Sequence, residues 1–385
     1  MKKILLIITL FALAGCSVFS PLQKRKFIAV FHLIENSQYE EARDVIEEMV
    51  NDENASQWPR TWYARGLLCQ NAYREGIKED EPELKELYTD QLYVAVYSYE
   101  RARRIDQGSR TDRQLAPNYV LLANEFQELG ERHFKKREYK EALRAFEQAI
   151  KITRSPVLSV ETDKGLIYNA ALAAYEGQKV EKSIGYLEKL DKKTYSSNVS
   201  HLLFSQYISN GDTLKAEKAL RKGIEKYENN EDLVLLLSDH LFQKDEKEDA
   251  LEVLNSAMKR DSLAYIFPYT KGLIYQKAGQ YPEAIEAYEK AVVLEPDHLM
   301  AYVHIATSYF NIGVEIEEEA RKLTLSSEVN QAKHETQAAF EAAAHWLDKA
   351  YEREPSGQIT IMEMFDLYMA LGINDKARRM QQMLQ

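Results

Sequence analysis

Residues 268–297, PYTKGLIYQKAGQYPEAIEAYEKAVVLEPD, decide the fold of this chain. Two amphipathic helices are expected there, separated by a turn at Gly279, because glycine takes left-handed backbone angles without a Cβ clash. In the first helix, Gly272 lets a partner helix approach closely. In the second helix, Ala284 and Tyr288 lie four residues apart and therefore on one face. The stretch predicts a tightly packed helix-turn-helix unit.

This unit resembles the tetratricopeptide repeat (TPR), a helix-turn-helix motif of about 34 residues. The matching positions are Gly272, Tyr275, Gly279, Tyr281, Ala284, Tyr288, Ala291 and Pro296. The stretch departs from the family at two leading positions, where Pro268 and Lys271 replace the usual Trp and Leu. The resemblance implies an α-solenoid, in which each hairpin buries its apolar side against its neighbours.

The small residue of the second helix recurs along the chain and marks nine units. Its positions are Ala42, Ala95, Ala142, Ser183, Ala216, Ala250, Ala284, Ala343 and Ala377. Residues at the turn position of Gly279 are Ser37, Arg137, Gln178, Gly211, Asp245, Gly313 and Gly372. We predict an all-α, TPR-type solenoid of about nine repeats over residues 24–385, with two extended hairpins. Almost no room is left for a separate catalytic domain.

The first extended hairpin is predicted from an insertion at residues 75–91. Pro82 suits the first turn of a helix, and the apolar pattern after it favours one long helix that runs to Ile105. The residues that follow, 106–117, are expected to form a loop. The third unit then begins near residue 123.

The second extended hairpin is predicted from an insertion at residues 314–337. Apolar residues continue the first helix of unit eight and lead into its second helix, with Ser327 suited to the N-cap. Each arm would protrude by about 12 residues, or about 18 Å at 1.5 Å per residue. The apolar positions of the two arms are Ile312, Ile316, Ala320, Leu323, Val329, Ala332, Thr336 and Ala339.

Residues 1–15 have the features of a bacterial lipoprotein signal peptide. Two lysines precede an apolar run, Ile4–Ala14, which is too short to span a bilayer as a permanent helix. The run ends in Leu-Ala-Gly-Cys at 13–16, which resembles a lipobox. The resemblance implies cleavage before Cys16 and its acylation with three chains, more than stable anchoring needs. The alternative is an ordinary signal peptide with an incidental cysteine.

The sequence after Cys16 indicates where such a lipoprotein would go. Residues 16–23 are expected to be a lipid tether. Ser17 stands where Asp commonly means retention in the inner membrane, so an outer-membrane location is favoured. The basic triplet 24–26 favours the periplasmic face over the cell surface, and it is equally well explained as a solvated helix start.

Composition limits the class of partner. The chain has 385 residues, is 45% apolar and 29% charged, and carries a net charge of −11, which argues against nucleic acid as a partner. With Cys16 lipidated, Cys69 has no cysteine to pair with and is expected to be a small buried hydrophobe. We expect no cofactor.

No motif supports catalysis or a metal site. The sequence lacks GxxxxGK, GxSxG and GxGxxG, and His334-Glu335 lacks the second histidine of HExxH because residue 338 is Ala. The eight histidines are scattered along the chain. We therefore predict a protein that is not an enzyme and has no catalytic or metal-binding residues.

In TPR proteins the first helix of each repeat lines a concave groove. Four residues after the Gly272 position, the repeats place a mostly apolar line, which suits an extended or helical peptide. Packing between neighbouring helices explains this line equally well. The line consists of Ile34, Gln70, Phe134, Tyr175, Ile208, Phe242, Gln276, Phe310 and Met369. Further groove candidates are Tyr63, Asn71, Asn124, Lys135, Tyr168, His201, Tyr269, Lys277 and Asn311.

One TPR subgroup clamps the C-terminal carboxylate of chaperone tails with groove Lys and Asn residues. That set is not reproduced here, and chaperone-tail binding is not predicted. The clamp lysine positions hold Tyr168, Leu235, Tyr269 and Val303.

These observations predict a membrane-anchored scaffold that binds other proteins in the bacterial cell envelope. By fold-level analogy it resembles TPR lipoproteins that assist outer-membrane assembly or secretion. The alternative is a glycan- or nutrient-binding outer-membrane lipoprotein that stacks sugar rings on groove aromatics. That class carries long irregular loops between repeats, whereas both insertions here favour helices.

Overall fold

The computed structural model describes residues 20–106, 109–228, 230–353, 355 and 357–384. This part of the chain contains nineteen α-helices, a short 3-10 helix at Ala55–Gln57 and no strand. Cys16 and the lipobox lie outside the described residues. The helices are α1 Pro21–Glu35, α2 Tyr39–Asn51, α3 Pro59–Lys78, α4 Pro82–Lys85, α5 Gln91–Asp106, α6 Ser109–Lys135, α7 Tyr139–Thr153, α8 Lys164–Glu176, α9 Val180–Asp191, α10 Ser197–Ser209, α11 Thr213–Lys226, α12 Glu231–Gln243, α13 Lys247–Arg260, α14 Ile266–Lys277, α15 Tyr281–Leu294, α16 Leu299–Ala320, α17 Ser326–Tyr351, α18 Gln358–Ala370 and α19 Asn374–Met383.

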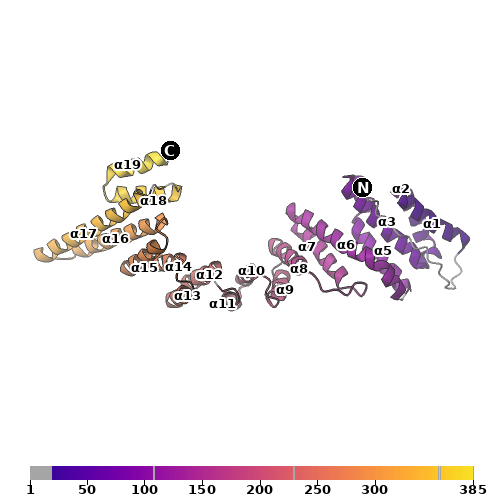
Figure 1. Ribbon diagram of the computed structural model, residues 1–385, viewed down its shortest axis with the longest axis horizontal. Helices are drawn as coiled ribbons and strands as arrows, with labels where there is room; N and C mark the ends of the chain where they lie inside the picture. Colours follow the sequence, from indigo (N-terminus) through magenta and orange to yellow (C-terminus); the bar gives the residue numbers. More distant parts are fainter. Residues whose placement is uncertain (1–19, 107–108, 229, 354, 356, 385) are drawn as a thin grey trace. The chain divides into compact units, whose positions relative to one another are not determined.

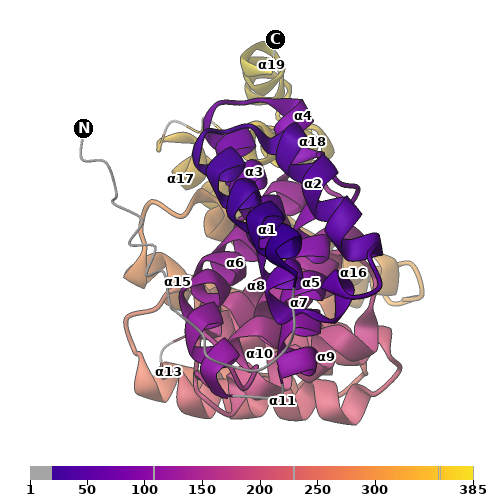
Figure 2. The same ribbon diagram turned by 90° about the vertical axis from the view of Figure 1, so that its right-hand side faces the viewer.

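Apart from the short α4, the helices pair into nine hairpins. The pairs are α1 with α2, α3 with α5, α6 with α7, and then each two successive helices up to α18 with α19 (Figure 1). In the pair of α8 and α9, the Ser183 hydroxyl donates to the carbonyl of Ala171. Viewed from the N-terminal side, α1 and α2 lie against α3 (Figure 2), so a hairpin also packs on the next one. The predicted all-α TPR-type solenoid is confirmed. The chain divides into two compact units, Met1–Leu190 (unit 1) and Asp191–Gln385 (unit 2).

The small residue that marks each repeat lies where two helices touch. Ala284 and its eight equivalents are at most 1% exposed, so each of these positions is enclosed by packing. Within a hairpin, an aromatic ring of the second helix also fills the space beside a glycine of the first. A Cβ on Gly272 would overlap the ring of Tyr288, and the same relation joins Gly66 to Tyr99. These contacts fix how closely the two helices approach.

The turns between paired helices use left-handed backbone angles. Gly279 has φ 72°, and six of the seven other expected turn residues also have positive φ. They are Ser37, Arg137, Gln178, Gly211, Asp245 and Gly372. The expectation is wrong for Gly313, which lies within α16 and is buried against the ring of Phe340.

The expectation of one helix from Pro82 to Ile105 is wrong. The chain forms the four-residue α4, turns through residues 86–90, and starts again at Gln91. The side chain of Gln91 stabilises this break by donating to the carbonyl oxygens of Cys69 (2.8 Å) and Leu84 (3.0 Å). The physical reason for the break is that the leucines before it and the apolar residues after it are buried in two different clusters. Leu84 and Leu87 pack in a cluster with α1–α3, whereas Leu92 and Val96 pack in a cluster with α6 and α7.

Most of the expected loop at 106–117 is helical; residues 107 and 108 lie outside the described residues. Helix α6 already begins at Ser109 and passes through Pro117. Leu115 and Tyr119 are buried in the core at 0% and 2% exposure. The apolar surface that these two side chains bury outweighs the backbone hydrogen bond that proline cannot donate.

Helix α1 begins three residues before the expected start at Lys24. Ser20 and Gln23 form a capping box, in which each side chain accepts a hydrogen bond from the other residue's backbone N–H, at 3.3 and 3.0 Å. Pro21 occupies the first helical position, where its missing N–H costs nothing. Part of the range 16–23 that we assigned to a tether is therefore helical.

The insertion at 314–337 extends both helices of the eighth hairpin, as predicted. Helices α16 and α17 have 22 and 26 residues and lie side by side (Figure 1). Ala332 and Ala339 are buried between the two arms. Ser327 is not the N-cap, because α17 begins one residue earlier, after Leu325, without a side-chain cap. We call residues 314–337 the hairpin extension.

Candidate functional site

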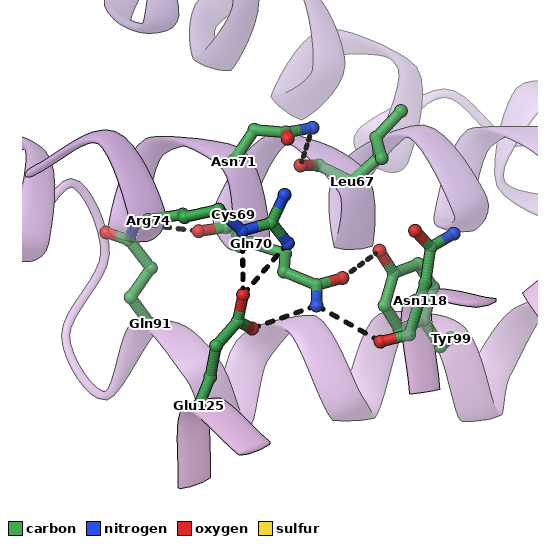
Figure 3. Close-up of polar contacts among 9 residues, drawn as sticks. All are labelled: Leu67, Cys69, Gln70, Asn71, Arg74, Gln91, Tyr99, Asn118 and Glu125. Atoms are coloured by element: carbon green, nitrogen blue, oxygen red, sulfur yellow. Dashed lines mark hydrogen bonds and ion pairs between the residues drawn. The ribbon is translucent and has the colours of Figure 1, made fainter. Parts of the chain in front are cut away.

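The groove line contains a buried polar network in unit 1 (Figure 3). Gln70 on α3 is 1% exposed, and its amide donates two hydrogen bonds and accepts one. The Tyr99 hydroxyl donates to Gln70 Oε1 (2.9 Å), and Gln70 Nε2 donates to the Asn118 carbonyl (3.1 Å) and to Glu125 Oε2 (2.8 Å). Of the two explanations for this line, packing between helices holds for Gln70. Gln70 joins three helices instead.

Glu125 on α6 carries the charge of this network. Its carboxylate accepts two hydrogen bonds from Arg74, at 3.0 and 2.8 Å, and burial raises the pKa of Glu125 against the opposing pull of Arg74. Glu125 was not predicted as a site residue, although its position in the sequence indicates a buried acid. Glu125 lies three residues after Leu122 and four before Leu129, on the apolar face of α6.

Some of the other unit 1 candidates contact side chains or backbone within the fold, and others are exposed. Tyr63 is half-buried, and its hydroxyl accepts a hydrogen bond from Asn118 Nδ2 (3.3 Å). Asn71 Nδ2 donates to the carbonyl of Leu67 in its own helix (3.0 Å). Phe134 packs edge-on against the ring of Tyr139 (5.3 Å). Asn124 and Lys135 are exposed, whereas Tyr168 and Tyr175 on α8 are half-buried.

In unit 2 the groove line is partly packing and partly open surface. Phe242 is half-buried, with the Lys277 ammonium 5.9 Å from its ring centre. Gln276 accepts a hydrogen bond from the Tyr288 hydroxyl (2.6 Å), which repeats the contact of Tyr99 with Gln70. Phe310 stacks on Phe340 across the eighth hairpin (5.3 Å).

The remaining positions of the line and the other candidates differ in exposure. Ile34 is buried, Asn311 is half-buried, and the exposed members are Ile208, His201, Lys277 and Met369.

Three successive first helices of unit 2 bring an aromatic, a histidine and a carboxylate to one wall. Tyr269 of α14 lies 5.8 Å from the ring of His304 of α16, which stacks on Tyr288 at 5.3 Å. The charge of Glu363 on α18 acts on both Tyr269 and Tyr288, although two repeats separate these helices. Of these groups, only Tyr269 was a candidate from the sequence.

Burial sets the charge of this wall. Burial, with a smaller effect of the nearby His298 in the same direction, lowers the pKa of His304 to about 4. It raises the pKa of Glu363, and Asp366 adds to that effect by like-charge repulsion. At neutral pH the imidazole of His304 and the phenol of Tyr269 are therefore uncharged.

The tetratricopeptide-repeat family model matches residues 269–298, which cover most of the seventh hairpin. This part of the chain is a tetratricopeptide repeat. The other eight hairpins share its helix-turn-helix build. Proteins of this family are in general non-catalytic scaffolds that mediate protein–protein interactions.

Several solved TPR structures resemble this chain in part. The C-terminal part of a TPR repeat-containing protein from Cytophaga hutchinsonii is 14% identical, with a TM-score of 0.45 over 66% of this chain and 92% of that one. A TPR repeats protein from Bacteroides fragilis is 18% identical, with a TM-score of 0.35 over 64% and 98%. The MamA protein is 19% identical, with a TM-score of 0.33 over 60% and 91%. At these scores the likeness supports no argument about function. No curated protein matches the chain.

Further features of the chain bear on chemistry and membranes. Cys69 is free and buried, and burial raises the pKa of its thiol to about 12, so it stays protonated at neutral pH. Within the described residues no three His, Cys, Asp or Glu side chains are grouped to hold a metal ion. Of the helices in the same residues, none combines the length and apolar character needed to cross a bilayer.

Proposed function

We propose that the chain is a lipid-anchored TPR scaffold that holds other proteins at the bacterial cell envelope. The observation that carries the proposal is the row of nine hairpins. Each hairpin uses its small residue for packing, which leaves first-helix side chains such as Asn124, Lys135 and Lys277 exposed for a partner. The anchor rests on the Leu-Ala-Gly-Cys sequence that ends at Cys16.

For the location we propose the periplasmic face of the outer membrane, in support of outer-membrane assembly or secretion. Ser17 in place of Asp supports export from the inner membrane. The basic start of α1 supports contact with the headgroups of the anchoring leaflet at about 1 kcal/mol per charge. Lys24 and Arg25 are exposed and suit that contact, whereas Lys26 pairs with Glu48 at 2.5 Å.

The anchor is tested by labelling cells with palmitate and separating their inner and outer membranes. We expect label on the wild-type chain in the outer-membrane fraction, and no label on Cys16→Ala. A labelled Cys16→Ala chain, or an unlabelled wild type, would overturn the lipid anchor.

The scaffold role is tested by crosslinking in intact cells, followed by purification of the chain. We expect crosslinks to one or a few envelope proteins, and weaker crosslinks after charge reversal at exposed groove residues, Lys135→Glu and Lys277→Glu. If no envelope fraction yields a crosslinked protein, the scaffold proposal fails.

Glycan binding ranks second for a structural reason. Phe242 and Phe310 are both half-buried, and Phe310 already stacks on Phe340, so little ring surface remains for a sugar. Electrophoresis through gels that contain polysaccharide separates the two functions. Retardation that disappears in Phe242→Ala and Phe310→Ala would favour glycan binding over the scaffold.

A further inference from the structure

Helix α18 leaves an apolar face in solvent. Ile359, Met362 and Met369 are 71%, 48% and 50% exposed. Met362 and Met369 are seven residues apart, two helical turns, so they lie nearly above each other on the helix surface. The opposite face of α18 is buried in the core through Ile361, Met364, Leu367 and Tyr368. The exposed face is therefore available without any unfolding.

The neighbouring helix of the same hairpin does not share this character. Most exposed residues of α19 are polar or charged, among them Arg378 and Arg379. Met383 is the one large apolar side chain of α19 with high exposure in the described residues, at 48%. The exposed apolar surface of this hairpin is therefore concentrated on α18.

Two carboxylates lie within the apolar face and have no cation beside them. Glu363 and Asp366 are one turn apart on α18, and among the described residues neither forms an ion pair. The groups that Glu363 faces on α14 and α15, Tyr269 and Tyr288, are uncharged. Two uncompensated acids at the edge of an apolar stripe leave a charge that a partner can neutralise.

We propose that the face formed by Ile359, Met362, Glu363, Asp366 and Met369 binds an amphipathic helix of a partner protein, one that carries lysine or arginine along its apolar stripe. This inference rests on the proposed scaffold function and names the chemistry of one partner. Flexible methionine side chains adapt to the surface of a bound helix. The carboxylates supply both the attraction and the selection for a basic sequence.

Charge disfavours the two other occupants of this face. A second copy of α18 would bring Glu363 and Asp366 near the same acids of its partner, and like charges across an interface are costly. An anionic lipid surface would be repelled for the same reason. A basic helix would not be repelled by these acids.

The test measures peptide binding to the full chain in phosphatidylcholine nanodiscs by fluorescence anisotropy, with empty nanodiscs as the blank. The probe is a synthetic 18-residue amphipathic helix of leucine and lysine, and its matched control replaces each lysine with glutamate. We expect the lysine peptide to bind at least tenfold more tightly. Its affinity should fall about tenfold in E363Q/D366N and in M362Q/M369Q, and should not change in M383Q.

Salt and pH give two further readouts. Raising the salt from 50 to 300 mM should weaken binding of the lysine peptide to the wild type and leave E363Q/D366N nearly unaffected. Lowering the pH through the raised pKa of Glu363 should also weaken binding, because the protonated carboxyl no longer attracts a cation. All of the substituted side chains are exposed or half-buried, so the fold should survive each change.

Equal binding of the two peptides, or unchanged affinity in E363Q/D366N, would overturn the proposal. Sedimentation showing a dimer that M362Q/M369Q dissociates would overturn it in favour of a second copy. If E363Q/D366N keeps every crosslink to envelope proteins, this inference fails while the scaffold function stands. If the wild type forms no crosslinks, the scaffold function itself fails.

Discussion

Because Gly272 has no Cβ, α14 and α15 can pack closely at this position. The ring of Tyr288 fills the space that a Cβ on residue 272 would need. We expect Gly272→Ala to lower the free energy of unfolding of unit 2 by about 1–3 kcal/mol, because the ring or all of α15 must move. Urea titration followed by circular dichroism measures the loss.

Gly185 on α9 provides the matched control. A Cβ at this position meets no atom within 4 Å, and the residue is helical. Gly185→Ala should therefore leave stability unchanged or raise it by up to about 1 kcal/mol through the higher helix propensity of alanine. Equal losses in the two variants would contradict the proposed overlap at Gly272.

His304 makes part of the stability depend on pH. Burial lowers the pKa of the folded imidazole to about 4 from an ordinary value of 6.5, so between these values the unfolded chain binds a proton that the folded chain does not. The stabilisation is complete above about pH 6.5 and is lost as the pH falls toward about 4, by up to about 3 kcal/mol at roughly 1.4 kcal/mol per pKa unit.

Urea midpoints at pH 7.5 and pH 5 test this dependence. His304→Phe keeps a ring against Tyr288 and cannot take up a proton, so its midpoint should fall less between the two pH values than that of the wild type. His334 is exposed, and His334→Gln should behave as the wild type does. If all three proteins lose stability equally, His304 is not the group responsible.

At the scale of elements, the repeats could be predicted from the sequence, whereas local departures from the repeat pattern could not. The small residue at Ala284 and its equivalents, which are 33 or 34 residues apart from Ser183 to Ala284, correctly located nine second helices because each position is enclosed by packing. The break between α4 and α5 could not be predicted in the same way. Leu84, Leu87 and Leu92 follow a helical period, and only the fold shows that they enter two different clusters.

The candidate site was harder to predict than the fold. A position four residues after the Gly272 equivalent can face the groove or a neighbouring helix, and hydrophobicity does not distinguish the two. Gln70 is buried because the hydroxyl of Tyr99 lies within hydrogen-bond reach, which depends on the distance between two helices 29 residues apart in sequence. His304 and Glu363 were missed because their proximity arises across three repeats.

The hairpin extension should be able to unfold while the repeats next to it stay folded. Ala332 is buried between α16 and α17, and a carboxylate there would have no partner. We expect Ala332→Asp to cost about 2–3 kcal/mol locally and to remove hydrogen-exchange protection from residues 314–337. Protection around Leu347, at the base of the hairpin, should remain.

Ala338 offers the same substitution on the solvent side of α17. Its side chain is exposed, so Ala338→Asp introduces the same charge without burying it. Hydrogen exchange should be nearly unchanged in this variant. Loss of protection in Ala338→Asp, or loss that spreads to α14 and α15 in Ala332→Asp, would contradict a separately folding extension.

At the scale of the whole molecule, each compact unit contains its own hydrophobic clusters. Those around Tyr99 and Ile46 consist of residues of unit 1, and those around Leu254, Tyr288 and Tyr368 consist of residues of unit 2. In a repeat array, stability is close to a sum of repeat and nearest-neighbour terms. A local defect should therefore stay within the unit in which it is made.

Tyr99 and Tyr288 allow a symmetric test of this independence. Each hydroxyl donates to a glutamine of the first helix, Gln70 in unit 1 and Gln276 in unit 2, at 2.9 and 2.6 Å. Removing either hydroxyl leaves an acceptor without its donor and should cost about 1–3 kcal/mol. Hydrogen exchange followed by mass spectrometry should show faster exchange within residues 20–190 for Tyr99→Phe and within 191–384 for Tyr288→Phe. The double variant should show both changes and no additional one. If one substitution speeds exchange in both units, the chain unfolds as a single cooperative body and the independence of the units is contradicted.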